Sequence, residues 1–143
     1  LRCLRAAPEP PDSAAPLRVI PGPQVARFPD AGLAAFFSGA FRVAPASDRR
    51  GLRLTGPRVE WDCGELASQP VVPGCVQIPP DGAPIVLGWD GPVTGGYPVI
   101  ASVIEADLAR LAQLKPGDPV RFVTTTLAAA RAAWAEPPVF ALE

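Results

Sequence analysis

The chain of 143 residues contains no histidine and no methionine, and it has only three cysteines. Without histidine, a Ser-His-Asp triad, a Cys-His nucleophile pair and any His-ligated zinc or haem site are excluded within this chain. Cys3, Cys63 and Cys75 form no Cys-x-x-Cys pair and are too few for a four-cysteine zinc site, so we expect no metal. The missing methionine leaves the chain without a natural start, and we expect a fragment of a longer protein.

The cysteines and the hydropathy indicate a cytoplasmic protein. An odd cysteine count is more typical of a reducing compartment. A Cys63–Cys75 disulfide remains an alternative, but we favour small buried apolar residues at these positions. No apolar run reaches the about 20 residues that a membrane span needs. The first 16 residues also lack the apolar core of a signal peptide.

Charge of either sign is scarce. Charged residues make up 19% of the chain, and 13 Lys and Arg against 14 Asp and Glu leave a net charge of -1. No strong field then points to nucleic acid or an anionic membrane as a partner. The 48% of hydrophobic residues is the balance of a globular protein, and the length is that of one domain.

Proline and glycine are abundant, at 20 and 13 residues. Prolines interrupt both helices and central strands, so the sequence predicts short strands joined by tight turns. Hairpins outnumber any βαβ pattern, and we predict a mainly β fold, an antiparallel and partly closed barrel with two or three short helices. The expected strands cover residues 17–20, 41–44, 52–55, 75–78, 84–87, 97–104 and 119–124. The expected helices start at Asp30, Asp107 and the N-cap Thr126.

Residues 1–16 are rich in Ala and Pro and are expected to be a linker or the end of a missing subdomain. Residues 17–143 would then form the domain. Its expected core consists of apolar side chains from the strands: Phe41, Val76, Ile78, Val86, Leu87, Ile100, Val103, Phe122 and Val123.

The first candidate site is the glycine-rich segment 90–98. Its two adjacent glycines let a ligand approach the backbone and leave amide N–H groups free. No Lys follows them, so the segment is not a P-loop. A plain hairpin turn is the alternative. The groups on offer are the Asp90 carboxylate, the Thr94 hydroxyl, the amides of Gly95 and Gly96, and the Tyr97 phenol.

The second candidate is the loop 47–51, which contains Ser47, Arg49 and Arg50. It lies in a cluster that also holds Arg42, Arg53 and Arg58. Guanidinium groups bind carboxylate or phosphate through two parallel hydrogen bonds. The alternative is a solvated loop in which Asp48 pairs with an arginine, an interaction worth about 0–1 kcal/mol at a surface.

The third candidate is Gln77, a lone polar residue in the apolar segment 75–78. Its carboxamide could face a pocket and read the donors and acceptors of a substrate. It could equally lie on the outward face of an alternating strand. If the pocket interpretation is right, Gln77, Thr94 and Tyr97 should line one concavity.

Four blocks in order, residues 17–24, 47–57, 73–98 and 106–118, together resemble one known family. They read Leu-Arg-Val-Ile-Pro-Gly-Pro-Gln, Ser-Asp-Arg-Arg-Gly-Leu-Arg-Leu-Thr-Gly-Pro, Pro-Gly-Cys-Val-Gln-Ile-Pro through Thr-Gly-Gly-Tyr-Pro, and Ala-Asp-Leu-Ala-Arg-Leu-Ala-Gln-Leu-Lys-Pro-Gly-Asp. The family is that of biotin-dependent carboxyltransferases, also called allophanate hydrolase subunit 2, KipI antagonist or the C component of 5-oxoprolinase. The resemblance covers the second half of the usual family chain, and it implies a cyclophilin-like β-barrel.

The resemblance implies three functions. Relatives open 5-oxoproline to glutamate with ATP, together with a KipI-like partner protein and a third lactam-utilisation protein. A similar module is the carboxyltransferase domain of urea carboxylase, where carboxybiotin donates its carboxyl group to urea. KipI-antagonist relatives act instead as non-enzymatic protein-binding modules. No cofactor is expected to bind this chain directly, since ATP would be used by the complex and carboxybiotin belongs to the urea system.

Both enzymatic functions need groups that grip a small amide and stabilise charge on its oxygen. No nucleophile or general base stands out, so we expect catalysis to need a partner or the missing half. The residues expected to hold the substrate are Ser47, Arg49, Gln77, Asp90, Thr94, Gly95, Gly96 and Tyr97, with Arg49 on a carboxylate or phosphate.

Overall fold

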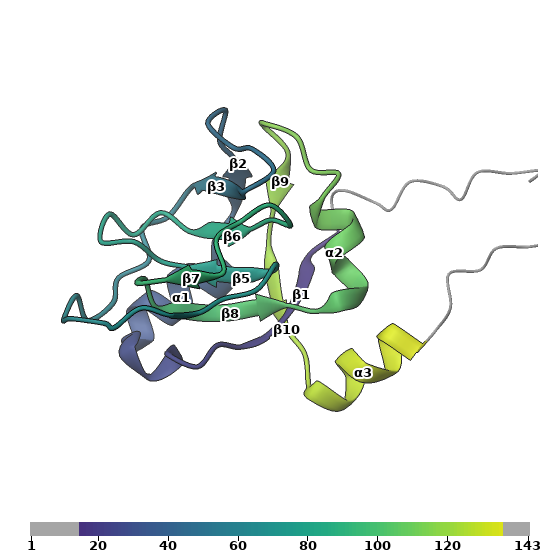
Figure 1. Cartoon of the computed structure of the whole chain (residues 1–143). Coiled ribbons are helices and arrows are strands. Elements are labelled where there is room, and N and C mark those ends of the chain that lie inside the picture. The colour runs from purple at the N-terminus through teal and green to yellow at the C-terminus, as the bar shows by residue number, and fades with distance from the viewer. Residues whose placement is uncertain (1–14, 136–143) are drawn as a thin grey trace, which may run out of the picture.

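The computed structural model describes residues 15–135, and Figure 1 shows their arrangement. The part of the expected linker before residue 15 lies outside the described residues. The strands are β1 (Leu17–Pro21), β2 (Phe41–Val43), β3 (Gly51–Thr55), β4 (Gln69–Pro70), β5 (Cys75–Gln77), β6 (Ile85–Leu87), β7 (Thr94–Gly95), β8 (Val99–Val103), β9 (Pro119–Val120) and β10 (Phe122–Thr124). The helices are η1 (Val25–Arg27, a 3-10 turn), α1 (Asp30–Ser38), α2 (Glu105–Leu111) and α3 (Leu127–Ala135).

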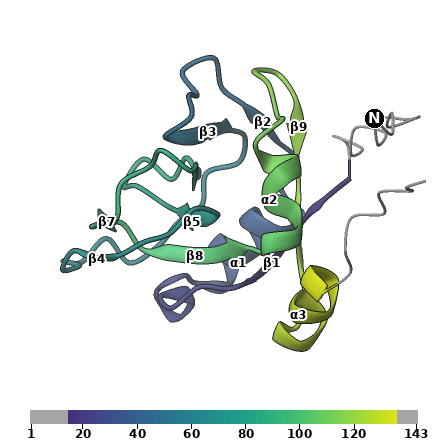
Figure 2. The ribbon, with the colours of Figure 1, turned by 45° about the vertical axis from the view of Figure 1, so that its right-hand side comes forward.

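Eight of these strands form one curled sheet in the order β10-β1-β8-β5-β6-β3-β2-β9. The strands at its two edges, β9 and β10, are separated in sequence by Arg121 alone, so one continuous segment pairs with both β2 and β1. The sheet is therefore nearly closed into a barrel, as Figures 1 and 2 show. The β1–β10 pair is parallel and the other pairs are antiparallel. The predicted mainly β barrel with short helices is confirmed.

The main core fills the inside of this barrel. Alternate residues of each strand point inward, among them Val76 of β5 and Val86 of β6, which pair across the two strands. Helix α1 contributes Phe36, whose ring stacks on Phe122 at 4.5 Å between centroids and is fully buried. The aromatic side chain of α1 thus fills one part of the barrel interior. The aromatic pair is worth about 0.5–1.5 kcal/mol beyond its buried area.

A second, smaller apolar cluster lies on the outer face of the same sheet. It consists of Val71, Cys75, Leu87 and Val99, with Ile85 packed against it. The cluster residues that belong to β5, β6 and β8 alternate along each strand with residues of the main core, so their side chains face the outside of the barrel. The two-stranded sheet of β4 and β7 pairs separately from the barrel. We call this pair of short strands the flap.

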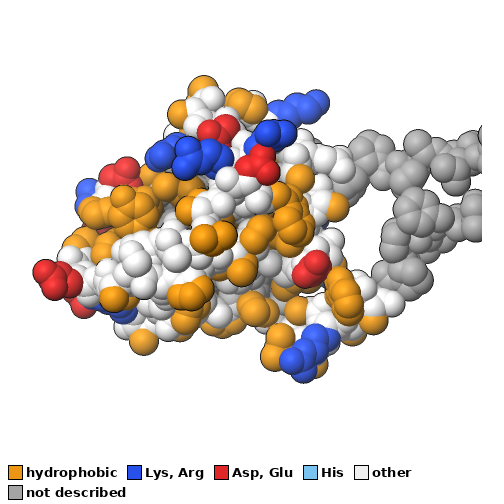
Figure 3. Space-filling model, viewed as in Figure 1, with side chains coloured by type: hydrophobic (Ala, Val, Ile, Leu, Met, Phe, Trp, Pro, Cys, Tyr) orange, Lys and Arg blue, Asp and Glu red, His pale blue; other side chains and the backbone are white. Residues whose placement is uncertain are grey.

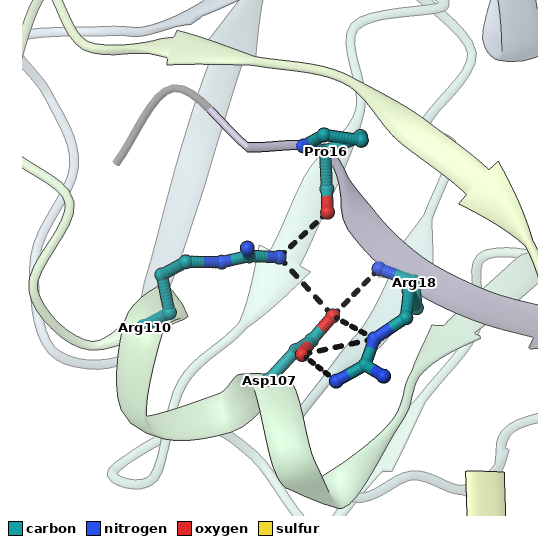
Figure 4. Close-up of polar contacts among 4 residues, drawn as sticks. All are labelled: Pro16, Arg18, Asp107 and Arg110. Atoms are coloured by element: carbon teal, nitrogen blue, oxygen red, sulfur yellow. Dashed lines mark hydrogen bonds and ion pairs between the residues drawn. The ribbon is translucent and has the colours of Figure 1, made fainter. Parts of the chain in front are cut away.

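Helix α2 is joined to β1 by a partly buried ionic network (Figure 4). The Asp107 carboxylate, 4% exposed, accepts hydrogen bonds from the backbone N–H and guanidinium of Arg18 and from Arg110. Burial raises the pKa of Asp107, but the hydrogen bonds and charges of Arg18 and Arg110 outweigh it, so the net pKa is lowered. Arg110 also donates to the carbonyl oxygen of Pro16 at 2.6 Å. The network therefore fixes the chain entry to the barrel and α2 together.

Several local features match or correct the predicted ones. The Thr126 hydroxyl accepts a hydrogen bond from the Ala129 N–H, which confirms the predicted cap of α3. The prediction that Val123 belongs to the core is wrong, because Val123 follows the inward Phe122 in β10 and is 42% exposed. Cys63 is exposed and Cys75 is buried, and both are free, so the disulfide alternative is wrong and the buried interpretation holds for Cys75 only.

Across the described residues 15–135, no helix has the length and apolarity to cross a bilayer. The visible face in Figure 3 mixes apolar side chains with scattered charged ones, and a group of basic and acidic side chains lies at the end that carries β2, β3 and their connecting loop. This loop is part of the candidate site described next.

Candidate functional site

A cavity of about 240 Å³ lies on the outer face of the barrel sheet, where β3, β6 and β5 run side by side. Ile85 of β6 pairs with Arg53 of β3 on one side and with Gln77 of β5 on the other. Three strands spaced by about 4.8 Å place the Cα atoms of Arg53 and Gln77 about 10 Å apart on one face. The lining residues are Ala46, Asp48, Arg50, Gly51, Arg53, Gln77, Ile85, Leu87 and Pro92.

Gln77 is 4% exposed, so its carboxamide needs partners. Its Nε2 atom donates a long hydrogen bond of 3.4 Å to the carbonyl oxygen of Tyr97. Of the side-chain polar atoms of residues 15–135, Arg110 Nε alone is both shielded from solvent and without a hydrogen-bond partner, so no atom of Gln77 belongs to this class. No hydrogen bond to Gln77 Oε1 is found among the described residues, and Gln77 is one of the residues that line the cavity. This oxygen can accept a hydrogen bond from a ligand.

The flap lies against the Gln77 side chain. Gly95 of β7 pairs with Gln69 of β4, and a Cβ on Gly95 would lie less than 3.0 Å from Gln77 Nε2. The absence of a side chain at Gly95 is therefore what lets the flap close over the carboxamide. A Cβ on the neighbouring Gly96 would meet its nearest heavy atom at 3.9 Å, so Gly96 makes no such contact.

A second cavity of about 380 Å³ opens beside the first, and Asp48 and Leu87 line both. Most of its wall is apolar and includes residues of α2, β3 and β6, among them Leu108 and Leu111. Exposed Trp89 lies at its edge. The cavity also has polar lining residues, which sequence reasoning had assigned to the substrate: Ser47, Arg49 and Asp90.

These polar groups are already engaged with one another or with the backbone. The Arg49 guanidinium lies 3.0 Å from the Asp90 carboxylate, in a pair whose side chains are 91% and 52% exposed. The Ser47 hydroxyl accepts from the Arg53 N–H and donates to the Arg53 carbonyl oxygen. The Asp48 carboxylate accepts from the Arg50 N–H. The loop is thus held in shape by its own side chains, and Asp48 caps the turn rather than pairing with an arginine.

The structure therefore divides the eight predicted site residues. Ser47, Arg49 and Asp90 line the larger cavity, whereas Gln77 lines the smaller one. Gly95 contacts the Gln77 side chain, and Tyr97 contacts it through its carbonyl oxygen. Thr94, Gly96 and the Tyr97 side chain are exposed on or next to the flap and are not among the residues lining the smaller cavity. Gln77, Thr94 and Tyr97 were expected to line one concavity, but of these three residues Gln77 alone lines the smaller cavity.

Arg50 and Arg53, which the sequence analysis placed in the arginine cluster but not among the residues expected to hold the substrate, both line the smaller cavity. A signal was present, because Arg53 stands between Leu52 and Leu54 and must point away from the core. That Arg53 and Gln77 line the same cavity depends on the register of three strands, which the local sequence does not show.

The sequence also agrees with known proteins. A family model described as the carboxyltransferase domain, subdomains A and B, matches residues 2–124. The chain belongs to the carboxyltransferase domain family. The resemblance drawn from the four sequence blocks is therefore confirmed.

Curated relatives of this carboxyltransferase domain fall into two groups. The 5-oxoprolinase C subunit of Escherichia coli K12 is 42% identical over 112 residues, which is 78% of this chain and 36% of that protein. The urea amidolyase of Lachancea kluyveri is 36% identical over 106 residues, which is 67% of this chain and 6% of that protein. The chain thus spans little more than a third of the length of the Escherichia coli relative that it matches.

Solved structures show the same fold. The Kluyveromyces lactis urea amidolyase superposes with a TM-score of 0.75 at 30% identity, over 85% of this chain and 8% of that chain. The urea carboxylase of the same organism superposes with a TM-score of 0.75 at 31% identity, over 80% of this chain and 11% of that chain. The barrel is therefore the fold of a carboxyltransferase domain.

Proposed function

We propose that the chain is the 5-oxoproline-binding part of the C component of an ATP-dependent 5-oxoprolinase. The component would work in the cytoplasm with a KipI-like partner protein and a third lactam-utilisation protein. ATP use is assigned to the complex rather than to this chain. The proposal is supported by the 42% and 36% identities to two 5-oxoprolinase C subunits.

The observation that carries the proposal is the row Arg53–Ile85–Gln77 across three paired strands. It puts a carboxamide and a guanidinium on one face of a cavity of about 240 Å³. 5-Oxoproline carries a lactam and a carboxylate, which are the natural partners of these two groups. Urea has no carboxylate, so it would leave the arginine of this row unused.

Each lining group then has a binding role. The lactam N–H donates to Gln77 Oε1, and the carboxylate takes parallel hydrogen bonds from Arg53 or Arg50. The apolar ring methylenes lie against Ile85 and Leu87. These residues hold and orient the lactam. Water addition across its C–N bond, which yields glutamate, is left to groups from the rest of the assembly.

A carboxyltransferase that moves a carboxyl group from carboxybiotin to urea is the second candidate. It is favoured by the TM-score of 0.75 with urea amidolyase over 85% of this chain. In that function Gln77 would hold the planar urea amide, and the arginines at the cavity would have no substrate carboxylate to bind.

Titration calorimetry of the 143-residue chain with 5-oxoproline, 2-pyrrolidinone and urea tests the proposal. 2-Pyrrolidinone keeps the lactam but lacks the carboxylate. A hydrogen bond to a charged group is worth about 1.5–3 kcal/mol, so the dissociation constant should rise about tenfold or more for 2-pyrrolidinone. Preference for urea would support the carboxyltransferase function. Binding of none of the three, with retention of a KipI-like protein in a pull-down, would support a protein-binding module.

A further inference from the structure

Two glutamine side chains form a reciprocal pair beneath the flap. Gln24 Nε2 donates to Gln69 Oε1 at 2.6 Å, and Gln69 Nε2 donates to Gln24 Oε1 at 3.0 Å. The backbone N–H of Val99 also donates to Gln24 Oε1, at 2.9 Å. Both glutamines are half-buried. We call these two residues the amide clasp.

The clasp joins three segments that are distant in sequence. Gln24 precedes η1, Gln69 belongs to β4 of the flap, and Val99 begins β8 of the barrel. Each strand of the flap is only two residues long, and their pairing with each other could not fix the position of the flap over the barrel. The clasp provides side-chain hydrogen bonds from the flap to the barrel wall, so it sets where β4 lies.

Each glutamine of the clasp is connected to Gln77 through one intervening residue. Gln69 pairs with Gly95, whose backbone lies directly against Gln77 Nε2. Val99 pairs with Gln77 across β8 and β5, at the register shift between Val76 and Gln77. The carboxamide of Gln77 is therefore enclosed between two backbone segments that the same pair of glutamines holds.

We infer that Gln24 and Gln69 are positioning residues that orient the Gln77 carboxamide, with its oxygen toward the cavity. The ligand named in this inference, 5-oxoproline, rests on the proposed function, whereas the geometry of the amide clasp does not. A site that reads a lactam needs its hydrogen-bonding group fixed by the surrounding structure rather than free to rotate. The glutamines themselves do not touch the ligand.

The test compares Gln69→Ala, Gln69→Glu and Gln113→Ala in the whole chain. Gln69→Ala removes both bonds of the pair and leaves the one from Val99 to Gln24. Gln69→Glu keeps the acceptor for Gln24 Nε2 but loses the donor to Gln24 Oε1, so it should restore part of the wild-type behaviour. Gln113 is exposed and serves as the matched control.

Two readouts separate positioning from stability. The side-chain amide resonances of Gln77, read by ¹⁵N–¹H NMR without ligand, should shift in Gln69→Ala and return toward the wild-type positions in Gln69→Glu. The dissociation constant for 5-oxoproline should rise roughly tenfold in Gln69→Ala, a change of about 1.4 kcal/mol in binding, because the Gln77 carboxamide is no longer held in place for the ligand. The melting temperature is measured alongside.

The inference is overturned if Gln69→Ala lowers the melting temperature but leaves the Gln77 resonances where they are in Gln113→Ala. If Gln69→Ala does not fold, Gln24→Ala, which removes the same two bonds from the other side, decides, and Gln77 resonances that stay where they are in Gln113→Ala count against the inference. If wild-type chain fails to bind 5-oxoproline, the proposed function fails, while the ligand-free resonances still test the positioning role.

Discussion

The close approach of Gly95 to Gln77 gives the sharpest test of the site geometry. In Gly95→Ala, the new Cβ would lie less than 3.0 Å from Gln77 Nε2, whereas ordinary contacts begin at 3.4 Å. The flap or the carboxamide must then move. All the atoms that the new Cβ would meet belong to the end of the Gln77 side chain, which can rotate away, so the cost should lie at the low end of the about 1–3 kcal/mol that overpacking causes. At about 3 °C per kcal/mol for a domain of this size, the melting temperature should fall by about 3 °C.

The matched control is Gly96→Ala, whose Cβ would find its nearest heavy atom at 3.9 Å. Neither glycine has a positive φ, so both substitutions test space rather than backbone strain. Gly96→Ala should therefore leave the melting temperature within about 1 °C of wild type.

A double-mutant cycle with Gln77→Ala identifies the contact itself. Truncating Gln77 removes the atom that the new methyl group would meet, so Gly95→Ala should cost much less in that background. Calorimetric unfolding of the four proteins gives the coupling free energy. An equal loss of stability in both backgrounds would refute the packing of the flap on Gln77.

Three further predictions concern the rest of the barrel and the site. Asp107→Asn should lower the free energy of unfolding by about 1.5–3 kcal/mol near pH 7, since the carboxylate is buried while the Arg18 side chain is partly exposed. Because folding lowers the pKa of Asp107, its contribution to stability is complete above the ordinary pKa of about 3.9 and is lost as the pH falls through the lower folded pKa. The difference in unfolding free energy between variant and wild type should therefore shrink in acid. A difference that stays constant with pH would contradict the ionic role. Phe36→Ala should cost about 3–5 kcal/mol in denaturant unfolding, since the ring is fully buried, and a loss below about 1 kcal/mol would argue against the stacked core. Arg53→Ala should weaken 5-oxoproline binding at least tenfold in calorimetry and leave 2-pyrrolidinone binding unchanged, and equal weakening of both would exclude a carboxylate contact.

Much of the fold follows from short-range features of the sequence. Val76 and Val86 were predictable core residues because each lies in a short apolar segment bounded by turn residues. Thr126 could be recognised as a cap from its position before an Ala-rich run. The prediction for Val123 was wrong because side chains in a regular strand alternate between the two faces, and the neighbouring Phe122 faces the interior.

The site was harder to predict because it depends on long-range pairing. Gln77 was recognised as the odd polar residue in an apolar strand, but its partner Arg53 lies two strands away in the sheet. The flap strand Gln69–Pro70 gives no periodic signal, since it is two residues long and contains a proline. The arginine that seemed most useful, Arg49, is instead paired with Asp90 at the neighbouring cavity.

Addition of 5-oxoproline to ¹⁵N-labelled chain, followed by NMR, shows whether the lactam binds between Gln77 and Arg53. We expect saturable shifts of the Gln77 side-chain amide and of the Arg53 side chain, while the exposed Gln113 amide stays in place. Shifts confined to Trp89 and its neighbours would place the ligand in the larger cavity and contradict the account, as would the absence of any shift at saturating concentration.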